Sequence, residues 1–242
     1  MSLFENIECK YSAVVSSDNE FIGYEGKAIL SPDVKYNLLE IIAGIAENYP
    51  YKDKKCRLFI NVHDFGKDYV SCFDDLEIFK VGGSKIYSVL NYIIPKVCVV
   101  FITKFINDYY NENYYPANKS EIIEDIIIEG IKDLIDYSYE IMLDDIGSDE
   151  CNHILSVTWE VVGYIRLCDT FTNMDALNDM SAMGVSKKNV MDYYIRQIDD
   201  FSAISFAKDV DSKEQFDKLR NYGINFLTGK YIDEIASSSK WF

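Results

Sequence analysis

Residues 118–147, with the sequence NKSEIIEDIIIEGIKDLIDYSYEIMLDDIG, are the stretch from which the fold is predicted. Their apolar side chains, projected at about 3.6 residues per turn, cover an arc of roughly 200°, about twice the stripe that a surface helix buries. Asn118 followed by Glu121 fits a capping box, and Gly147 can take the left-handed conformation that ends a helix. The pattern predicts one long central helix with neighbours on two sides.

The opposite face of this predicted helix is acidic, and we call its five acids the acidic ridge. They are Asp125, Glu129, Asp133, Asp136 and Glu140. The whole chain carries 24 basic and 40 acidic residues, a net charge of −16. A chain this acidic repels phosphate backbones on average and attracts basic partners. The ridge is therefore predicted to bind a basic protein partner, and nucleic acid is not the expected ligand.

The first part of the chain predicts a small, mostly antiparallel sheet with one or two helices. Alternating or apolar segments predict strands at 7–15, 21–30, 57–62, 68–73 and 76–81. Helices are expected over 31–48, where Ser31, Pro32 and Asp33 form a typical start, and over 85–94. Residues 96–106 fit either a strand or a helix, and their continued helical spacing favours a helix.

The second part of the chain is predicted to be helical, with helices at 118–147, 151–171, 176–183, 187–208 and 213–236. The predicted fold class is thus α+β: a small, mostly antiparallel N-terminal sheet with one or two helices, followed by a helical C-terminal bundle. The expected domains are an α+β subdomain over 1–115 and a helical subdomain over 116–242 packed on it. A single domain is the alternative.

Composition indicates a protein with a sizeable core, since 48% of its 242 residues are hydrophobic. The N-terminus has no secretory pattern, and Pro95, Lys96 and Lys104 interrupt the most apolar run, so we expect a cytoplasmic protein with no membrane segment. The six cysteines form no C-x-x-C pair, a spacing typical of free thiols in a reducing compartment. No cofactor and no metal are expected.

Residues 176–195 contain a pattern that resembles a helix-turn-helix. Gly184 falls at the turn, and Ser186 can cap a second helix packed through Val190 and Tyr193. The resemblance implies a DNA-binding regulator in which Lys187, Lys188 and Asn189 face the major groove. Asp179 and Met180 depart from the pattern, because an apolar and a small residue are usual at those two positions.

Three other segments carry residues with chemical potential. His63 beside Asp64 in a predicted turn could place a catalytic base, which gives an enzyme as a further alternative. Acids around Gly147, including Asp144 and Asp145, supply oxygen ligands but do not follow the calcium-loop pattern. The segments Gly82-Gly83-Ser84-Lys85 and Gly23-x-x-Gly26-Lys27 could meet an anion, although neither has the spacing of a nucleotide loop.

Tyrosine is abundant, with 19 residues, more than a core of this size needs with its hydroxyls satisfied. Exposed tyrosines are favoured at protein interfaces, while an AT-rich coding bias is the other explanation. Together with the acidic ridge, this surplus predicts a non-enzymatic binding protein, that is, an inhibitor, immunity or regulatory factor.

Overall fold

The computed structural model describes residues 7–30, 36–52, 56–62, 83–103, 131–147, 161–173 and 185–238. Its strands are β1 (Glu8–Ser16), β2 (Phe21–Ile29), β3 (Arg57–Asn61), β4 (Cys98–Thr103), β5 (Glu140–Ile146), β6 (Tyr164–Leu167), β7 (Ile204–Ala207) and β8 (Phe226–Thr228). Its helices are α1 (Leu38–Asn48), α3 (Gly83–Ile93), α6 (Asp169–Thr172), α7 (Lys187–Asp200), α8 (Lys213–Asn221) and α9 (Lys230–Ser238).

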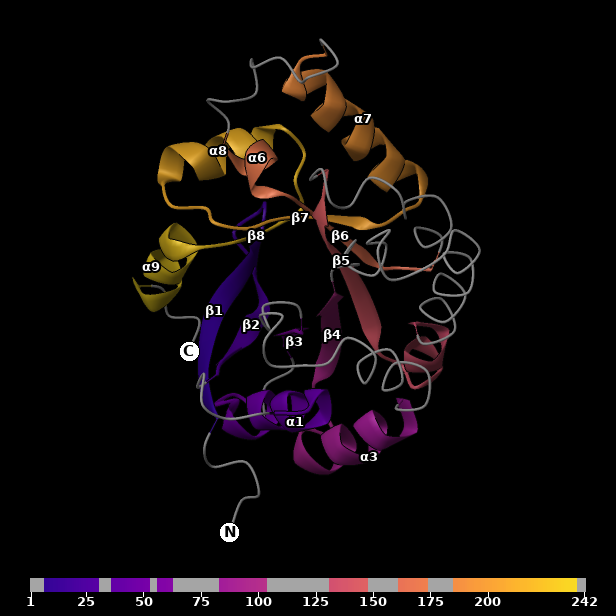
Figure 1. Cartoon of the computed structure of the whole chain (residues 1–242). Coiled ribbons are helices and arrows are strands. Elements are labelled where there is room, and N and C mark those ends of the chain that lie inside the picture. Colours follow the sequence, from indigo (N-terminus) through magenta and orange to yellow (C-terminus); the bar gives the residue numbers. More distant parts are fainter. Residues whose placement is uncertain are drawn as a thin grey trace, which may run out of the picture. The chain divides into compact units, whose positions relative to one another are not determined.

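The strands are hydrogen-bonded in chain order from β1 to β8, and β8 pairs back with β1, so the sheet is a closed barrel (Figure 1). The pairs β3–β4, β5–β6, β6–β7 and β7–β8 are parallel, whereas β1 and β8 are antiparallel. The predicted fold class is wrong, because β5 to β8 lie in the half that was expected to be a helical bundle.

The predicted helix over 118–147 is also wrong. Residues 131–136 are helical, and the chain then turns at Ser138, whose φ is +66°. The amide of Tyr139 donates to the Leu134 carbonyl and that of Ser138 to the Ile135 carbonyl, the pattern that closes a helix C-terminus. Strand β5 follows, and Gly147, with φ +91°, comes directly after that strand. Residues 118–130 lie outside the described residues.

Two further helix predictions are wrong for a related reason. The predicted helix 187–208 ends at Asp200, because Ser202 takes a φ of +58° and the amide of Ala203 donates to the Ile198 carbonyl. The predicted helix 213–236 is divided at Gly223 into α8, β8 and α9.

Residues 96–106, for which a helix was favoured, contain strand β4, whose residues Val99 to Ile102 are all buried. A continuous apolar run of this length is typical of a parallel strand covered on both faces.

The chain divides into two compact units. Unit 1 comprises Met1–Tyr11 and Glu25–Ile141, and unit 2 comprises Ser12–Tyr24 and Met142–Phe242. The domain boundary expected at 115–116 lies outside the described residues. No helix within the described ranges is long and apolar enough to span a membrane.

Unit 1 contains a buried helix, α1, whose C-terminal end was predicted correctly from the sequence. Helix α1 ends at Asn48 as predicted, and it buries Ile41, Ile42 and Ile45. Its start differs: Asn37 is the N-cap, and its side chain and that of Glu40 form the capping box. The neighbouring helix α3 packs beside α1 (Figure 1).

Unit 2 contains strands β6, β7 and β8 with helices packed on them. Helix α7 contacts β7 and α6, and α9 contacts β8 (Figure 1). The buried face of α7 consists of Met191, Tyr194 and Ile198, at the i, i+3, i+7 spacing of one helical stripe. Several charged residues follow the carboxyl ends of β6 and β7, among them Asp169, Lys208 and Asp209.

Candidate functional site

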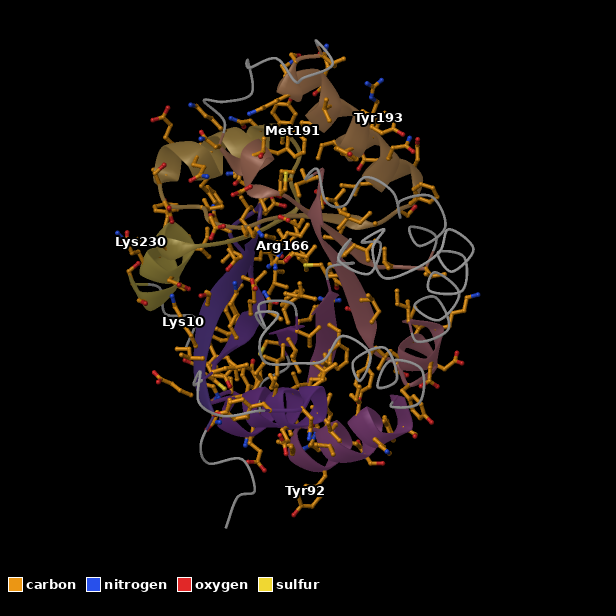
Figure 2. The ribbon with its side chains drawn as sticks, in the orientation of Figure 1. Lys10, Tyr92, Arg166, Met191, Tyr193 and Lys230 are labelled. Atoms are coloured by element: carbon orange, nitrogen blue, oxygen red, sulfur yellow. The ribbon has the colours of Figure 1, made fainter. Side chains whose placement is uncertain are left out.

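The first polar feature of unit 2 is an ion pair between two neighbouring strands. Asp144 on β5 and Arg166 on β6 are 2% and 1% exposed. Arg166 donates from Nε to Asp144 Oδ1 at 2.7 Å and from Nη2 to Asp144 Oδ2 at 2.6 Å. The guanidinium carbon of Arg166, labelled in Figure 2, lies 5.8 Å from the centre of the Phe206 ring. Such a bidentate ion pair fixes the orientation of both side chains and compensates both charges.

Two further residues extend this pair toward solvent. Asp145, with φ +63°, donates its amide to Asp144 Oδ1 at 2.7 Å. Lys208, which follows β7, places Nζ 3.4 Å from Asp145 Oδ1 and 3.8 Å from Asp144 Oδ1. The Lys208 and Asp145 side chains are 23% and 17% exposed. We call Asp144, Asp145, Arg166 and Lys208 the charge cluster; it combines two carboxylates with two cations.

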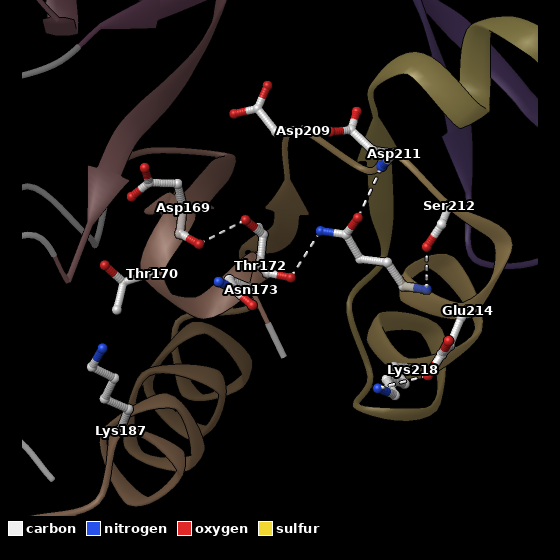
Figure 3. Close-up of a pocket in the computed structure, with 11 residues that line it drawn as sticks. Asp169, Thr170, Thr172, Asn173, Lys187, Asp209, Asp211, Ser212, Glu214 and Lys218 are labelled. Atoms are coloured by element: carbon white, nitrogen blue, oxygen red, sulfur yellow. Dashed lines mark hydrogen bonds and ion pairs between the residues drawn. The ribbon is translucent and has the colours of Figure 1, made fainter. Parts of the chain in front are cut away.

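A surface cavity of about 640 Å³ lies beyond the same strands (Figure 3). It is lined by Asp169, Thr170, Thr172 and Asn173 after β6, Lys187 on α7, Asp209, Asp211 and Ser212 after β7, and Glu214, Gln215 and Lys218 on α8. Two connections along the chain link the cavity to the charge cluster: Asp209 follows Lys208, and Asp169 comes three residues after Arg166.

Gln215 holds two walls of this cavity together. Its Nε2 donates to the Thr172 carbonyl at 2.9 Å, and its Oε1 accepts from the backbone amide of Asp211 at 2.9 Å. Ser212 caps α8 by accepting from the Gln215 amide. The end of α6 and the start of α8 are thereby joined through one amide side chain.

The charge cluster and the cavity both lie at the carboxyl ends of parallel strands. Asp144 and Asp145 are close to the end of β5, Asp169 follows β6, and Lys208 and Asp209 follow β7. In α/β barrels, binding and catalytic residues come from this end of the strands. The position of these residues in unit 2 is therefore that of a ligand site.

Unit 1 has its own buried polar pair. Glu25 on β2 and Asn61 on β3 are 3% and 1% exposed, and Asn61 Nδ2 donates to Glu25 Oε1 at 2.9 Å. Lys27 Nζ lies 3.7 Å from the same oxygen, with its side chain 42% exposed. Lys27 and Gly26 belong to the segment considered for anion binding, and here Lys27 is part of an ion pair.

The residues of the acidic ridge do not share one helical face. Asp133 and Asp136 lie in the helical segment 131–136, whereas Glu140 is on strand β5 and pairs with Arg57 at 3.2 Å. Asp125 and Glu129 lie outside the described residues. The ridge depended on an uninterrupted helix, and the turn at Ser138 removes that basis.

The helix-turn-helix resemblance is tested only in its second half. Ser186 caps α7 as predicted, accepting from the Asn189 amide. Tyr193, which was expected to pack, is 55% exposed, and Tyr194 is buried in its place. Of the three proposed DNA-facing residues, Lys187 lines the cavity, Lys188 pairs with Asp192, and Asn189 is exposed. Residues 174–184 lie outside the described part of the chain, as do His63, Asp64 and His153.

The described cysteines, Cys9, Cys56, Cys98 and Cys168, are free thiols. Cys168 is buried directly before α6, and burial raises the pKa of its thiol to about 11, with the charge of Asp145 adding to the effect. A thiol with so high a pKa is protonated at neutral pH and is a poor nucleophile. Cys168 is therefore a structural residue beside the charge cluster.

No protein-family model matches the chain, and no curated protein matches it in sequence. Solved structures do match it in fold. The S helix-GGDEF-EAL structure of Vibrio cholerae LapD, bound to c-di-GMP, gives a TM-score of 0.62 at 16% identity, covering 94% of this chain and 53% of the LapD chain. A calcium and c-di-GMP complex of Klebsiella pneumoniae BlrP1 gives 0.61 at 13% identity, covering 91% of this chain and 54% of the BlrP1 chain.

A standalone EAL protein from Vibrio cholerae O395, in its c-di-GMP-bound form, gives a TM-score of 0.56 at 14% identity and covers 94% of this chain and 91% of its own. The chain thus spans about half the length of LapD and BlrP1, and its fold is that of EAL-domain structures. Because these similar structures bind a small cyclic nucleotide, the prediction of an inhibitor with a basic protein partner is overturned. The DNA-binding and His63 alternatives are not supported by these neighbours either.

A metal is suggested by the calcium in the BlrP1 complex, and the charge cluster does not fit one. Asp144 Oδ1 accepts from Arg166 and from the Asp145 amide, and Oδ2 accepts from Arg166. Two cationic groups stand where a metal would need further oxygens. Across the described ranges, no three His, Cys, Asp or Glu side chains gather as a metal site.

Arg166 and Lys208 were missed by the sequence analysis, which noticed only Asp144 and Asp145. A signal did exist: Asp144 and Arg166 each interrupt a short apolar run, Ile141–Ile146 and Tyr164–Leu167. Opposite charges inside two buried strands indicate a buried ion pair. The pairing itself depends on strand neighbours that the sequence does not state.

Proposed function

We propose that the chain binds a cyclic dinucleotide of the c-di-GMP class in the cavity of unit 2. The observation that carries this proposal is the cavity itself: about 640 Å³ of space at the carboxyl ends of β6 and β7. Ligand pockets typically measure roughly 300–1,000 Å³, and the volume of this cavity lies within that range. The likeness in fold to structures holding c-di-GMP gives the ligand class.

The lining of the cavity suits both parts of a guanine nucleotide. Lys187 on α7 and Lys218 on α8 provide ammonium groups for phosphodiester oxygens (Figure 3). Asp209, Asp211 and Glu214 provide carboxylate acceptors for the N–H donors on a guanine edge. Lys218 also pairs with Glu214 at 3.0 Å, so the two side chains are oriented relative to each other before a ligand arrives.

The test is titration calorimetry of the whole chain with c-di-GMP, with cyclic di-AMP as the control for base recognition. We expect saturable binding of c-di-GMP and weaker binding of cyclic di-AMP, because carboxylates do not accept from the N1 of adenine. A charge reversal at Lys187 should weaken binding by about tenfold or more, the scale of one charge-assisted hydrogen bond.

The chain offers a matched control in the next residue. Lys188 carries the same charge, lies on the same helix turn and pairs with Asp192, but does not line the cavity. Lys188→Glu should therefore bind c-di-GMP like the unmodified chain, while Lys187→Glu should not. Absence of saturable binding, or equal losses in the two variants, would refute the proposal.

A further inference from the structure

Among the described residues, the charge cluster of unit 2 combines equal numbers of negative and positive side chains. Asp144 and Asp145 contribute two negative charges, and Arg166 and Lys208 contribute two positive ones, all linked by contacts of 3.8 Å or less. The deepest member, Asp144, faces Arg166, and the more exposed Asp145 faces Lys208. The carboxylates at the end of β5 thus have a cation on each side.

Most of the acceptor capacity of Asp144 is also taken up, and that of its Oδ1 is full. A carboxylate oxygen has about two lone-pair directions. Its Oδ1 accepts from Arg166 Nε and the Asp145 amide and is 3.8 Å from Lys208 Nζ, while Oδ2 accepts from Arg166 Nη2. A divalent cation bound at Oδ1 would have to displace one of these donors, and one bound at Oδ2 would lie beside the Arg166 guanidinium.

Such a cation would also meet like charge at close range. Metal–oxygen distances for calcium are about 2.3–2.6 Å, so an ion on either carboxylate would stand near the Lys208 ammonium. Repulsion between a divalent ion and an ammonium in a partly buried site is strong, because solvent screens it poorly. Lys208 is only 23% exposed, which limits its escape into water.

We propose that the Lys208 ammonium is a built-in cation that replaces a divalent metal at the end of β5, so that ligand binding by unit 2 is independent of metal. The second clause of this inference rests on the proposed nucleotide function; the first does not. The calcium of the BlrP1 complex belongs to that protein, whereas the positive charge beside Asp144 and Asp145 here comes from a side chain that follows β7.

The first experiment measures Mn²⁺ binding by calorimetry and by electron paramagnetic resonance, on the unmodified chain and on Asp145→Asn. Because the chain is strongly acidic, weak surface binding is expected in both. Binding specific to the cluster is the part that Asp145→Asn removes. We expect the unmodified chain and Asp145→Asn to bind Mn²⁺ with equal affinity. A Mn²⁺ site that Asp145→Asn weakens about tenfold or more would overturn the inference.

The second experiment changes the cation itself. Lys208→Glu removes the ammonium and adds a carboxylate, and it should create one Mn²⁺ site that is lost again in Lys208→Glu/Asp145→Asn. Lys208→Met is the matched control, since it removes the charge without adding a ligand and should gain less. A folded Lys208→Glu chain without a Mn²⁺ site would overturn the inference. If the variant does not fold, the unmodified chain still decides.

The third experiment compares c-di-GMP binding in EDTA with binding in Mn²⁺. Equal affinity is expected, and binding that needs Mn²⁺ would overturn the inference while supporting the nucleotide function. Absence of c-di-GMP binding under both conditions would refute the proposed function and the metal-independence clause that rests on it. The replacement of a metal by Lys208 would then be judged from Mn²⁺ binding alone.

Discussion

Asp144 in unit 2 and Glu25 in unit 1 are both buried carboxylates on barrel strands, yet their partners differ. Asp144 receives two hydrogen bonds from the buried guanidinium of Arg166. Glu25 receives one from the Asn61 amide and lies 3.7 Å from Lys27, whose side chain is 42% exposed. One acid is part of a buried ion pair, and the other is held by an amide and a cation that water reaches.

This difference determines what each acid contributes. Removing one partner of a buried ion pair leaves the other charge without compensation, which is costly even where the intact pair adds little stability. A carboxylate held by an amide leaves no such charge behind. The charge cluster is therefore expected to be the more sensitive of the two sites, and the following tests start from the largest expected effect.

Asp144→Asn should destabilise the chain by about 3–5 kcal/mol, because Arg166 would remain buried and charged. The free energy of unfolding in urea, followed by circular dichroism, measures this effect. Asp144→Leu/Arg166→Met is the control, since it removes both charges and should cost less than the single change. If Asp144→Asn is as stable as the unmodified chain, Asp144 and Arg166 do not form the buried ion pair described above.

Alkaline pH should weaken the fold through Cys168. Its folded pKa of about 11 exceeds the ordinary value of 9.0 because the thiol is buried. Above pH 9 the unfolded chain loses this proton first, so the stabilisation is present below about pH 9 and is lost as pH rises to about 11. The loss amounts to about 2–3 kcal/mol.

The difference in unfolding free energy between the unmodified chain and Cys168→Ala, measured across this pH range, isolates the contribution of the Cys168 thiol. Cys98→Ala is the control from unit 1. Partial desolvation raises the pKa of the Cys98 thiol as well, but Cys98 is more exposed than Cys168, so its removal should change the alkaline profile less. If the unfolding free energies of the two variants depend on pH in the same way, the buried Cys168 thiol does not cause the loss of stability at alkaline pH.

Glu25→Gln should cost about 1 kcal/mol or less, the smallest effect of the three. The amide oxygen of glutamine can still accept from Asn61, and the lost ion pair with half-exposed Lys27 is of the kind that contributes little. Urea unfolding measures it, and Glu25→Leu, which also removes the acceptor, is the comparison. A loss as large as that of Asp144→Asn would erase the distinction between the two sites.

Local signals in the sequence located several elements correctly. The strands predicted at 7–15, 21–30 and 57–62 correspond to β1, β2 and β3, and α3 lies close to the predicted 85–94. The C-terminal end of α1 and the Ser186 cap of α7 were also predicted. These features depend on turn residues, caps and short-range periodicity, which neighbouring residues in the chain determine.

The helix ends at 138 and 202 could not be predicted in the same way. The left-handed position that closes a helix usually carries glycine, but here Ser138 and Ser202 take it with φ values of +66° and +58°. Because no glycine marks these two positions, the apolar spacing predicted helices that continued through the residues of β5 and β7. At Gly223 the glycine was present, and the division of 213–236 could have been recognised.

The sequence by itself determined a chain able to bury a large core, an acidic charge balance and the local start and end of several elements, because composition and short-range spacing are sufficient for these. Only the tertiary structure decided that isoleucine-rich segments are parallel strands, since a continuous apolar run suits a buried helix and a buried strand equally. It also decided that Asp144, Arg166 and Lys208, from three different strands or their ends, meet as one cluster. That meeting depends on strand order and register, which arise from long-range hydrogen bonds between residues far apart in the chain.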